Sequence, residues 1–166
     1  MEEFYSNFVT SNNVILKNDI PATHAVVSSH TGTPCGTSDN RLYIQNCGFD
    51  SVFEMLNHLL DNSLTRPEYP PSYVYSGDLR QFDAKEFFPN NDPKALSMDE
   101  FGYVYVPTGC LDGSVQCLLH IHFHGCLMEA NEIGTDFITE SGFLEIADYN
   151  NIIILFPQVL IISFQS

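Results

Sequence analysis

The feature that most constrains the fold is a pair of strand patterns separated by a helical one in the last third of the chain. Residues 118–123 alternate between two faces, and residues 152–156 are continuously apolar. Between them, Phe143, Ile146 and Ala147 follow helical spacing. A continuous apolar strand fits the buried middle of a parallel sheet, and strand, helix and strand in succession form a βαβ unit by default. The sequence therefore predicts an α/β fold.

The other elements of this single domain are predicted from shorter patterns. Residues 51–60 give the clearest helix, because Ser51 and Glu54 make a capping box and apolar residues recur at helical spacing. Residues 1–20 are interpreted as a short helix leading into a strand. Residues 21–47, rich in Thr, Ser, Gly and Pro, are interpreted as a loop. Strands are expected near residues 14–16, 73–75, 79–82 and 103–106.

The charge balance excludes some classes of partner. Asp and Glu number 21 against 6 Lys and Arg, which gives a formal net charge of −15. Such a potential repels phosphate backbones and anionic membrane surfaces, so we expect neither nucleic acid nor membrane as a partner. The first residues, MEEFYSNF, lack the basic and apolar regions of a signal peptide, and no apolar stretch reaches the ~18 residues of a membrane span.

Five cysteines leave two interpretations open. Cys35 and Cys47 flank one polar loop, Cys110 and Cys117 flank another, and Cys126 is left over. Two short-loop disulfides of a secreted protein fit this spacing, and so do five reduced thiols of a cytosolic protein. No two cysteines form a CxxC pair, so a structural zinc site has little support.

Three histidines form the first chemical candidate. His120 and His122 share one face of the predicted strand, and with His124 they could converge on zinc or copper. No second ligand cluster is visible, and a turn at Gly125 should carry His124 away from that face. We therefore interpret these histidines as packing and hydrogen-bonding residues, and we expect neither a metal nor a cofactor.

The second candidate is the turn that follows the same strand. Phe123-His124-Gly125-Cys126 is a strand end followed by His-Gly and a small residue, as in the oxyanion-hole turns of esterases. A glycine lets the backbone turn sharply, so that the N–H groups after it can stabilise the oxyanion of a tetrahedral intermediate. No serine lies in the GxSxG elbow of such enzymes, and nothing marks Cys126 as an activated thiolate.

Several blocks together resemble the polyhydroxybutyrate depolymerases. CLLHIHFHGCL at 117–127 resembles the family's CxLHVAFHGCLQ, and GYVYVPTGC at 102–110 resembles GYxYVPxxC. GFLEIADYN at 142–150, IIILFPQ at 152–158, YIQNCGFD at 43–50 and IGTDF at 133–137 are similar to GYNEWADxN, IIVLYPQ, YIxNCxxD and IGxxF. The resemblance runs from about residue 20 to 158, and residues 159–166 diverge. The block order resembles the circularly permuted type of the family.

The resemblance implies a site and a chemistry. It implies serine-esterase hydrolysis of short-chain hydroxyalkanoate esters or polyester, without metal, in a secreted protein. The family's general base matches His24, with His30 as the alternative, and the oxyanion donors match the backbone N–H groups of Gly125 and Cys126, in the turn with His124. It also implies disulfides Cys35–Cys47 and Cys110–Cys117, whereas the block expected to pair with Cys126 is absent.

Departures from the family pattern bear on activity. His122 replaces a small residue, Ile146 stands where the family often has Trp, and the elbow serine and the acid are missing. We therefore expect an incomplete α/β-hydrolase sheet in which residues 152–156 have an unpaired edge, and a fragment that is inactive alone. The alternatives are a non-catalytic remnant that binds an ester or a partner, and, on the histidines alone, a metal-binding module.

Overall fold

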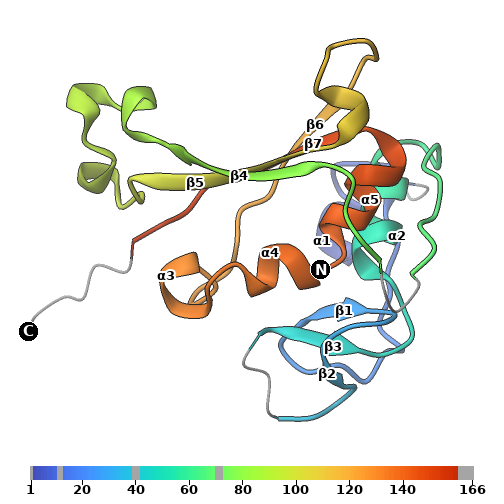
Figure 1. Cartoon of the computed structure of the whole chain (residues 1–166). Coiled ribbons are helices and arrows are strands. Elements are labelled where there is room, and N and C mark those ends of the chain that lie inside the picture. Colours follow the sequence, from blue (N-terminus) through green and yellow to red (C-terminus); the bar gives the residue numbers. More distant parts are fainter. Residues whose placement is uncertain (1, 11–12, 39–41, 70–72, 161–166) are drawn as a thin grey trace, which may run out of the picture.

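The computed structural model describes the chain except for residues 1, 11–12, 39–41, 70–72 and 161–166. In the described part, Figure 1 shows a larger sheet, a small sheet and helices between them. The helices are α1 (Glu2–Tyr5), α2 (Ser51–Leu59), α3 (Ala130–Ile133), α4 (Asp136–Glu140) and α5 (Phe143–Asn150). The strands are β1 (Val26–Ser28), β2 (Thr33–Pro34), β3 (Ile44–Asn46), β4 (Asp78–Asp83), β5 (Phe101–Val106), β6 (Leu118–Ile121) and β7 (Ile152–Phe156). Short 3-10 turns, η2 (Lys85–Phe87), η3 (Pro89–Asn91), η4 (Pro93–Leu96) and η5 (Thr108–Cys110), lie in the connections.

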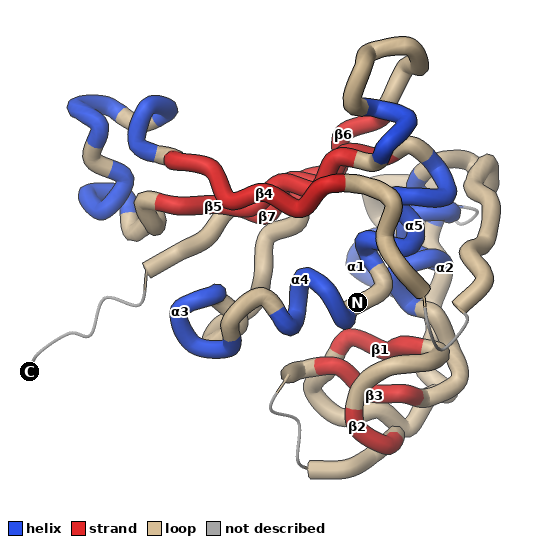
Figure 2. The backbone as a smooth tube through the Cα atoms, viewed as in Figure 1, coloured by secondary structure: helices blue, strands red, loops and turns tan. Residues whose placement is uncertain are grey.

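The larger sheet contains the predicted strand–helix–strand unit. Its strand order is β4-β5-β7-β6, with β6 and β7 parallel and β5 antiparallel to both of its neighbours. Leu118 pairs with Ile152, and Ile121 with Leu155. The chain between β6 and β7 forms α3, α4 and α5 on one face of this sheet (Figure 2). The predicted α/β fold is confirmed.

The position of β7 differs from the sequence expectation. β7 lies between β5 and β6 and has partners on both sides, so it has no unpaired edge. The edge strands of this sheet are β4 and β6. The expectation was wrong because it assumed that an incomplete sheet would lose the neighbour of β7, whereas β5 pairs with β7 from an earlier part of the chain.

The main core lies between this sheet and α5. Alternate residues of β7 point to opposite faces, and Ile152, Ile154 and Phe156 are buried against the helical layer. They pack with buried residues of α2, α4, α5 and β5: Val52, Phe53, Leu56, Phe137, Ile138, Phe143, Leu144, Ile146, Ala147 and Tyr105. The core explains why residues 152–156 are apolar, while Ile153 and Leu155, on the other face, are only partly buried.

Residues 21–47 are more ordered than the loop expected for them. They contain β1, β2 and β3, which form a three-stranded sheet in which β3 pairs in parallel with both others. The fully buried Gln45 joins the surrounding segments: its Oε1 accepts from the N–H groups of Thr23 (2.9 Å) and Gly36 (3.2 Å), and its Nε2 donates to Thr37 O (2.8 Å). The sequence did not predict these strands, because each is only two or three residues long and the surrounding composition is typical of a loop.

Helix α2 is confirmed, but its cap is not the one expected. Asp50, rather than Ser51, is the N-cap residue, and its carboxylate accepts from Phe53 N at 3.0 Å. Ser51 instead bonds to β1, donating to Val27 O at 2.7 Å and accepting from Val27 N at 3.2 Å. Ser51 therefore fixes α2 against the small sheet.

The remaining strand predictions have mixed outcomes. Residues 79–82 and 103–106 lie in β4 and β5, as expected. Residues 14–16 and 73–75 form no strand, because neither segment has a pairing partner among the described residues. Both implied disulfides are present, with Cα–Cα distances of 4.8 Å for Cys35–Cys47 and 6.1 Å for Cys110–Cys117. No helix in the described part of the chain is long and apolar enough to cross a membrane.

Candidate functional site

His24, the first candidate base, lies on an exposed segment that leads into β1. The N–H of Thr23, next to it, is held by the buried Gln45, so the backbone on the N-terminal side of His24 is anchored. The imidazole is exposed and lies edge-on to Tyr43, with ring centroids 6.1 Å apart. His24 thus combines an anchored backbone with an exposed ring.

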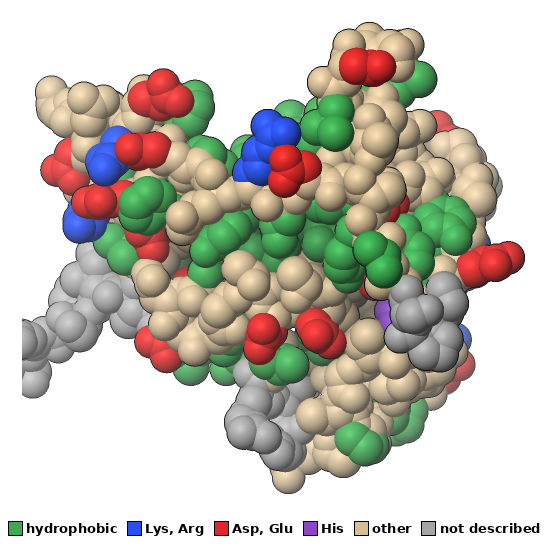
Figure 3. All heavy atoms as spheres, in the orientation of Figure 1, with side chains coloured by type: hydrophobic (Ala, Val, Ile, Leu, Met, Phe, Trp, Pro, Cys, Tyr) green, Lys and Arg blue, Asp and Glu red, His purple; other side chains and the backbone are tan. Residues whose placement is uncertain are grey.

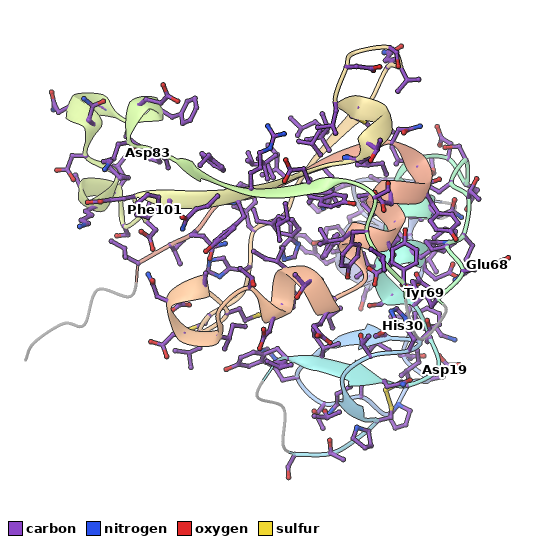
Figure 4. All side chains as sticks on the ribbon, viewed as in Figure 1. Asp19, His30, Glu68, Tyr69, Asp83 and Phe101 are labelled. Carbon is purple, nitrogen blue, oxygen red and sulfur yellow. A yellow bond between two sulfur atoms is a disulfide. The ribbon has the colours of Figure 1, made fainter. Side chains whose placement is uncertain are left out.

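His30, the alternative candidate, lies in a more enclosed place. Its ring stacks on Tyr69 with centroids 3.8 Å apart, and Figure 4 shows the two residues beside the small sheet. Its Nδ1 lies 3.4 Å from Ser28 Oγ, and its Nε2 lies 3.6 Å from Glu145 Oε1. Burial lowers the pKa of His30, against the raising effect of the Asp50 and Glu140 charges. Both ring nitrogens therefore have neighbours from the protein.

Glu145 is the centre of a buried polar cluster that the sequence did not reveal. It is 5% exposed, and burial raises the pKa of its carboxyl group to about 7. Tyr75 Oη lies 3.3 Å from Glu145 Oε1. Burial thus lowers the pKa of His30 and raises that of Glu145, so both groups are shifted toward their uncharged forms. Glu145 occupies a buried position on α5, and only its helical register with Phe143 and Ile146 could have signalled this.

The second half of the candidate site is the turn at the carboxyl end of β6. His124 Nδ1 lies 2.8 Å from Gly125 O, and His124 Nε2 accepts from Val159 N at 3.3 Å. A Cβ at Gly125 would lie 2.8 Å from Met128 Sδ, so a side chain there would have to displace Met128. Gly125 and Cys126 are exposed. Carboxyl ends of parallel strands are where open α/β sheets place their ligands.

The three histidines near this turn do not share one environment. His120 stacks on Phe143 at 5.6 Å, and His122 contacts Phe137, Phe143 and Phe156, so both face the helical layer. Burial, followed by the neighbouring histidines, lowers the pKa of His122 to about 4. His124 instead lies against Val159. Among the described residues, no three His, Cys, Asp or Glu side chains group closely enough to hold a metal ion.

Cys126 is the one cysteine of the described chain without a disulfide, and it is exposed. The two bridges lie elsewhere: Cys35–Cys47 joins the strand ends of the small sheet, and Cys110–Cys117 closes the loop before β6. Cys126 contributes its backbone to the turn. In an acyl-transfer site, a turn of this kind would supply the oxyanion donors and an imidazole would supply the base.

Comparisons with known proteins identify related chains. No family model matches. The chain is 33% identical over 159 residues to a poly(3-hydroxybutyrate) depolymerase of Delftia acidovorans, covering 95% of this chain and 30% of that protein. It is 32% identical over 157 residues to a polyhydroxybutyrate depolymerase of Talaromyces funiculosus, covering 93% of this chain and 43% of that protein. The chain therefore spans less than half the length of these relatives.

Solved structures show the same relationship. A crystal structure of a PHB depolymerase from Penicillium funiculosum matches with a TM-score of 0.78 and 33% identity, over 93% of this chain and 46% of that one. A PHB depolymerase variant in complex with an R3HB trimer matches with a TM-score of 0.70 and 33% identity, over 84% of this chain and 42% of that one. These matches confirm the expected α/β-hydrolase-type fold.

Proposed function

We propose that this chain, a homologue of the polyhydroxybutyrate depolymerases over 95% of its length, carries the base and the oxyanion turn of a serine ester hydrolase. The family relationship expected from the sequence blocks is confirmed by the identities of 33% and 32%. The substrate class we propose is the short hydroxyalkanoate ester or polyester, in line with the relatives' names. The observation that carries the proposal is the His124-Gly125-Cys126 turn at the carboxyl end of β6, in which Gly125 and Cys126 are exposed.

In the proposed mechanism, His24 takes the proton of a serine hydroxyl and later gives it to the leaving alcohol. The backbone N–H groups of Gly125 and Cys126 donate to the oxyanion of the tetrahedral intermediate. The 166 residues contain no GxSxG elbow. We therefore assign the nucleophile and the orienting acid to a separate segment of polypeptide, as the relatives' greater length allows.

His24 is a better candidate for the base than His30. A general base must reach the proton that it abstracts, and the ring of His24 is exposed. His30 is stacked on Tyr69 and faces Glu145, so its approach is blocked on one ring face and at Nε2. We assign His30 a structural role in the contact between the small sheet and α5.

The isolated chain provides the first test. We expect no turnover of nitrophenyl butyrate or hydroxybutyrate oligomers, because loss of the serine alone costs about six orders of magnitude in related chemistry. Saturable turnover that disappears in His24→Ala would contradict this expectation. Turnover that disappears in Cys126→Ser would assign the nucleophile to Cys126 instead.

A non-catalytic binding role is the second candidate, favoured by the missing elbow serine. It predicts that the chain retains hydroxybutyrate oligomers in equilibrium dialysis and that no added serine-bearing segment produces turnover. The two disulfides support an extracellular location for either function.

A further inference from the structure

We propose that residues 161–164 of this chain, Ile-Ile-Ser-Phe, pack into an apolar hollow beside the β4–β5 hairpin and close it within the same molecule. These four residues lie outside the described part of the chain. The proposal goes beyond the proposed function, since it requires neither a nucleophile nor an ester. We define the hollow as the cavity between the β4–β5 hairpin and the residues that follow β7.

The hollow has a volume of about 520 Å³ and a mostly apolar lining. Val104 and Leu155, which pair across β5 and β7, place it on the face of the sheet opposite α5. Figure 4 shows Asp83 and Phe101, two further lining residues, side by side at the end of the β4–β5 ladder. Figure 3 shows charged side chains gathered around hydrophobic ones at this end of the molecule. The lining also includes Phe82, Phe87, Phe88 and Phe123, of which Phe87 and Phe123 are 70% and 72% exposed. An apolar patch of this kind marks a place where another group binds.

The polar side chains of the lining accept hydrogen bonds and have none left to donate. They are Asp83, Glu86, Asp99 and Gln158. The Nε2 of Gln158 already donates to Phe156 O at 3.3 Å and to Pro157 O at 3.2 Å. A hydroxyalkanoate ester presents carbonyl oxygens, for which these side chains offer no donor. A peptide with apolar side chains suits the hollow better, because its N–H groups can donate to the carboxylates.

The residues before position 161 lead the chain to the rim of the hollow. Val159 forms an antiparallel bridge with Met98, and Leu160 N donates to Ser97 O at 3.0 Å. Met98 and Gln158 both line the hollow, so the segment starts from its rim. Four extended residues reach up to about 14 Å, which exceeds the width of about 10 Å of a sphere of 520 Å³. Residues 161–164 can therefore reach across the hollow.

Charge and tethering favour this segment over other occupants. Residues 161–164 carry no charge and three of the four are apolar, whereas the hollow has three carboxylates in its lining, which repel acidic segments. A short tether gives the segment an effective concentration on the order of mM. A second copy of the chain, with the same net charge of −15, is repelled and reaches the hollow only at its bulk concentration. The occupant is therefore the chain's own segment.

A tryptophan reporter tests the proposal in the full chain, which contains no tryptophan of its own. In Phe164→Trp, we expect blue-shifted emission and acrylamide quenching several-fold slower than in the control Phe8→Trp, at a side chain that is 71% exposed. Adding Phe87→Asp, which puts a charge into the lining, should abolish this protection, whereas adding the similarly exposed Phe8→Asp should leave it unchanged. The neutral dye Nile red gives a second readout. Ile162→Asp should bind the dye about tenfold more tightly than the unsubstituted chain, as expected if the segment closes the hollow in about nine molecules of ten.

Three outcomes would overturn the proposal. Equal emission and quenching in Phe164→Trp and Phe8→Trp would show that the segment does not enter the hollow. Protection that grows with chain concentration, together with a dimer in sedimentation, would place the segment in a second copy. Loss of protection on adding hydroxybutyrate oligomers would make the hollow an ester site. The Phe164→Trp readout decides the matter even if Phe87→Asp does not fold, and it is independent of ester turnover.

Discussion

Replacing Glu145 by glutamine tests whether the buried carboxyl group makes stability depend on pH. The side chain is 5% exposed, and burial, with added repulsion from Asp50 and Glu140, raises its pKa to about 7 from an ordinary value of 4.5. At 1.36 kcal/mol for each pH unit between the two pKa values, this corresponds to about 3 kcal/mol.

The sign follows from proton linkage. The folded chain binds the Glu145 proton more tightly than the unfolded chain, so this contribution to stability is complete below pH 4.5. It is lost as the pH rises through about 7. A glutamine side chain cannot ionise, so the variant should not show this loss. We compare the free energy of unfolding of Glu145→Gln with that of the unsubstituted chain at each pH. Between pH 4 and pH 8, we expect this difference to shift by about 2–3 kcal/mol in favour of the variant.

Urea denaturation followed by circular dichroism at several pH values between 4 and 9 measures the difference. The matched control is Glu132→Gln, an exposed glutamate on α3, for which we expect less than about 0.5 kcal/mol at any pH. A difference between Glu145→Gln and the unsubstituted chain that stays constant from pH 4 to pH 9 would refute the reasoning.

Three further predictions concern stability and the site. Asp148→Ala should lower the free energy of unfolding by about 3 kcal/mol, because Asp148 accepts hydrogen bonds from Ser76 N at 2.7 Å and from the buried Tyr105. The control is Asp78→Ala, at an exposed side chain, which should cost less than about 1 kcal/mol when both variants are measured by urea denaturation. Joint Cys35→Ser and Cys47→Ser should cost about 3 kcal/mol by loop entropy, which thermal unfolding would show; an unchanged Tm would contradict it. In a complex with a serine-bearing segment, His24→Ala should abolish ester turnover, whereas His58→Ala, at a histidine of α2, should leave it unchanged.

Part of the fold could be predicted because its signals are local. The alternation at residues 118–121 and the apolar run at 152–156 reflect burial on one face or on two, and both became strands. The cap of α2 was misassigned because Asp50 and Ser51 are both good capping residues. The choice depends on the bonds between Ser51 and Val27, which are 24 residues apart.

The candidate site could be predicted less completely. The turn at Gly125 is a local pattern of residues, so it was found. The cluster of Glu145, His30 and Tyr75 was not, because its members are far apart in sequence and each looks ordinary alone. Its unusual pKa values arise from burial, which no short pattern encodes.

The sequence by itself determined the α/β class, the two disulfide pairs, helix α2 and the turn after β6, since periodicity and the family blocks specify them. Only the tertiary structure decided that β7 is central, that β6 is an edge strand of the described sheet and that residues 21–47 form a sheet around Gln45. The physical reason is that strand order and burial depend on contacts between distant segments. β5 reaches β7 across more than 40 residues, and no local pattern records that pairing.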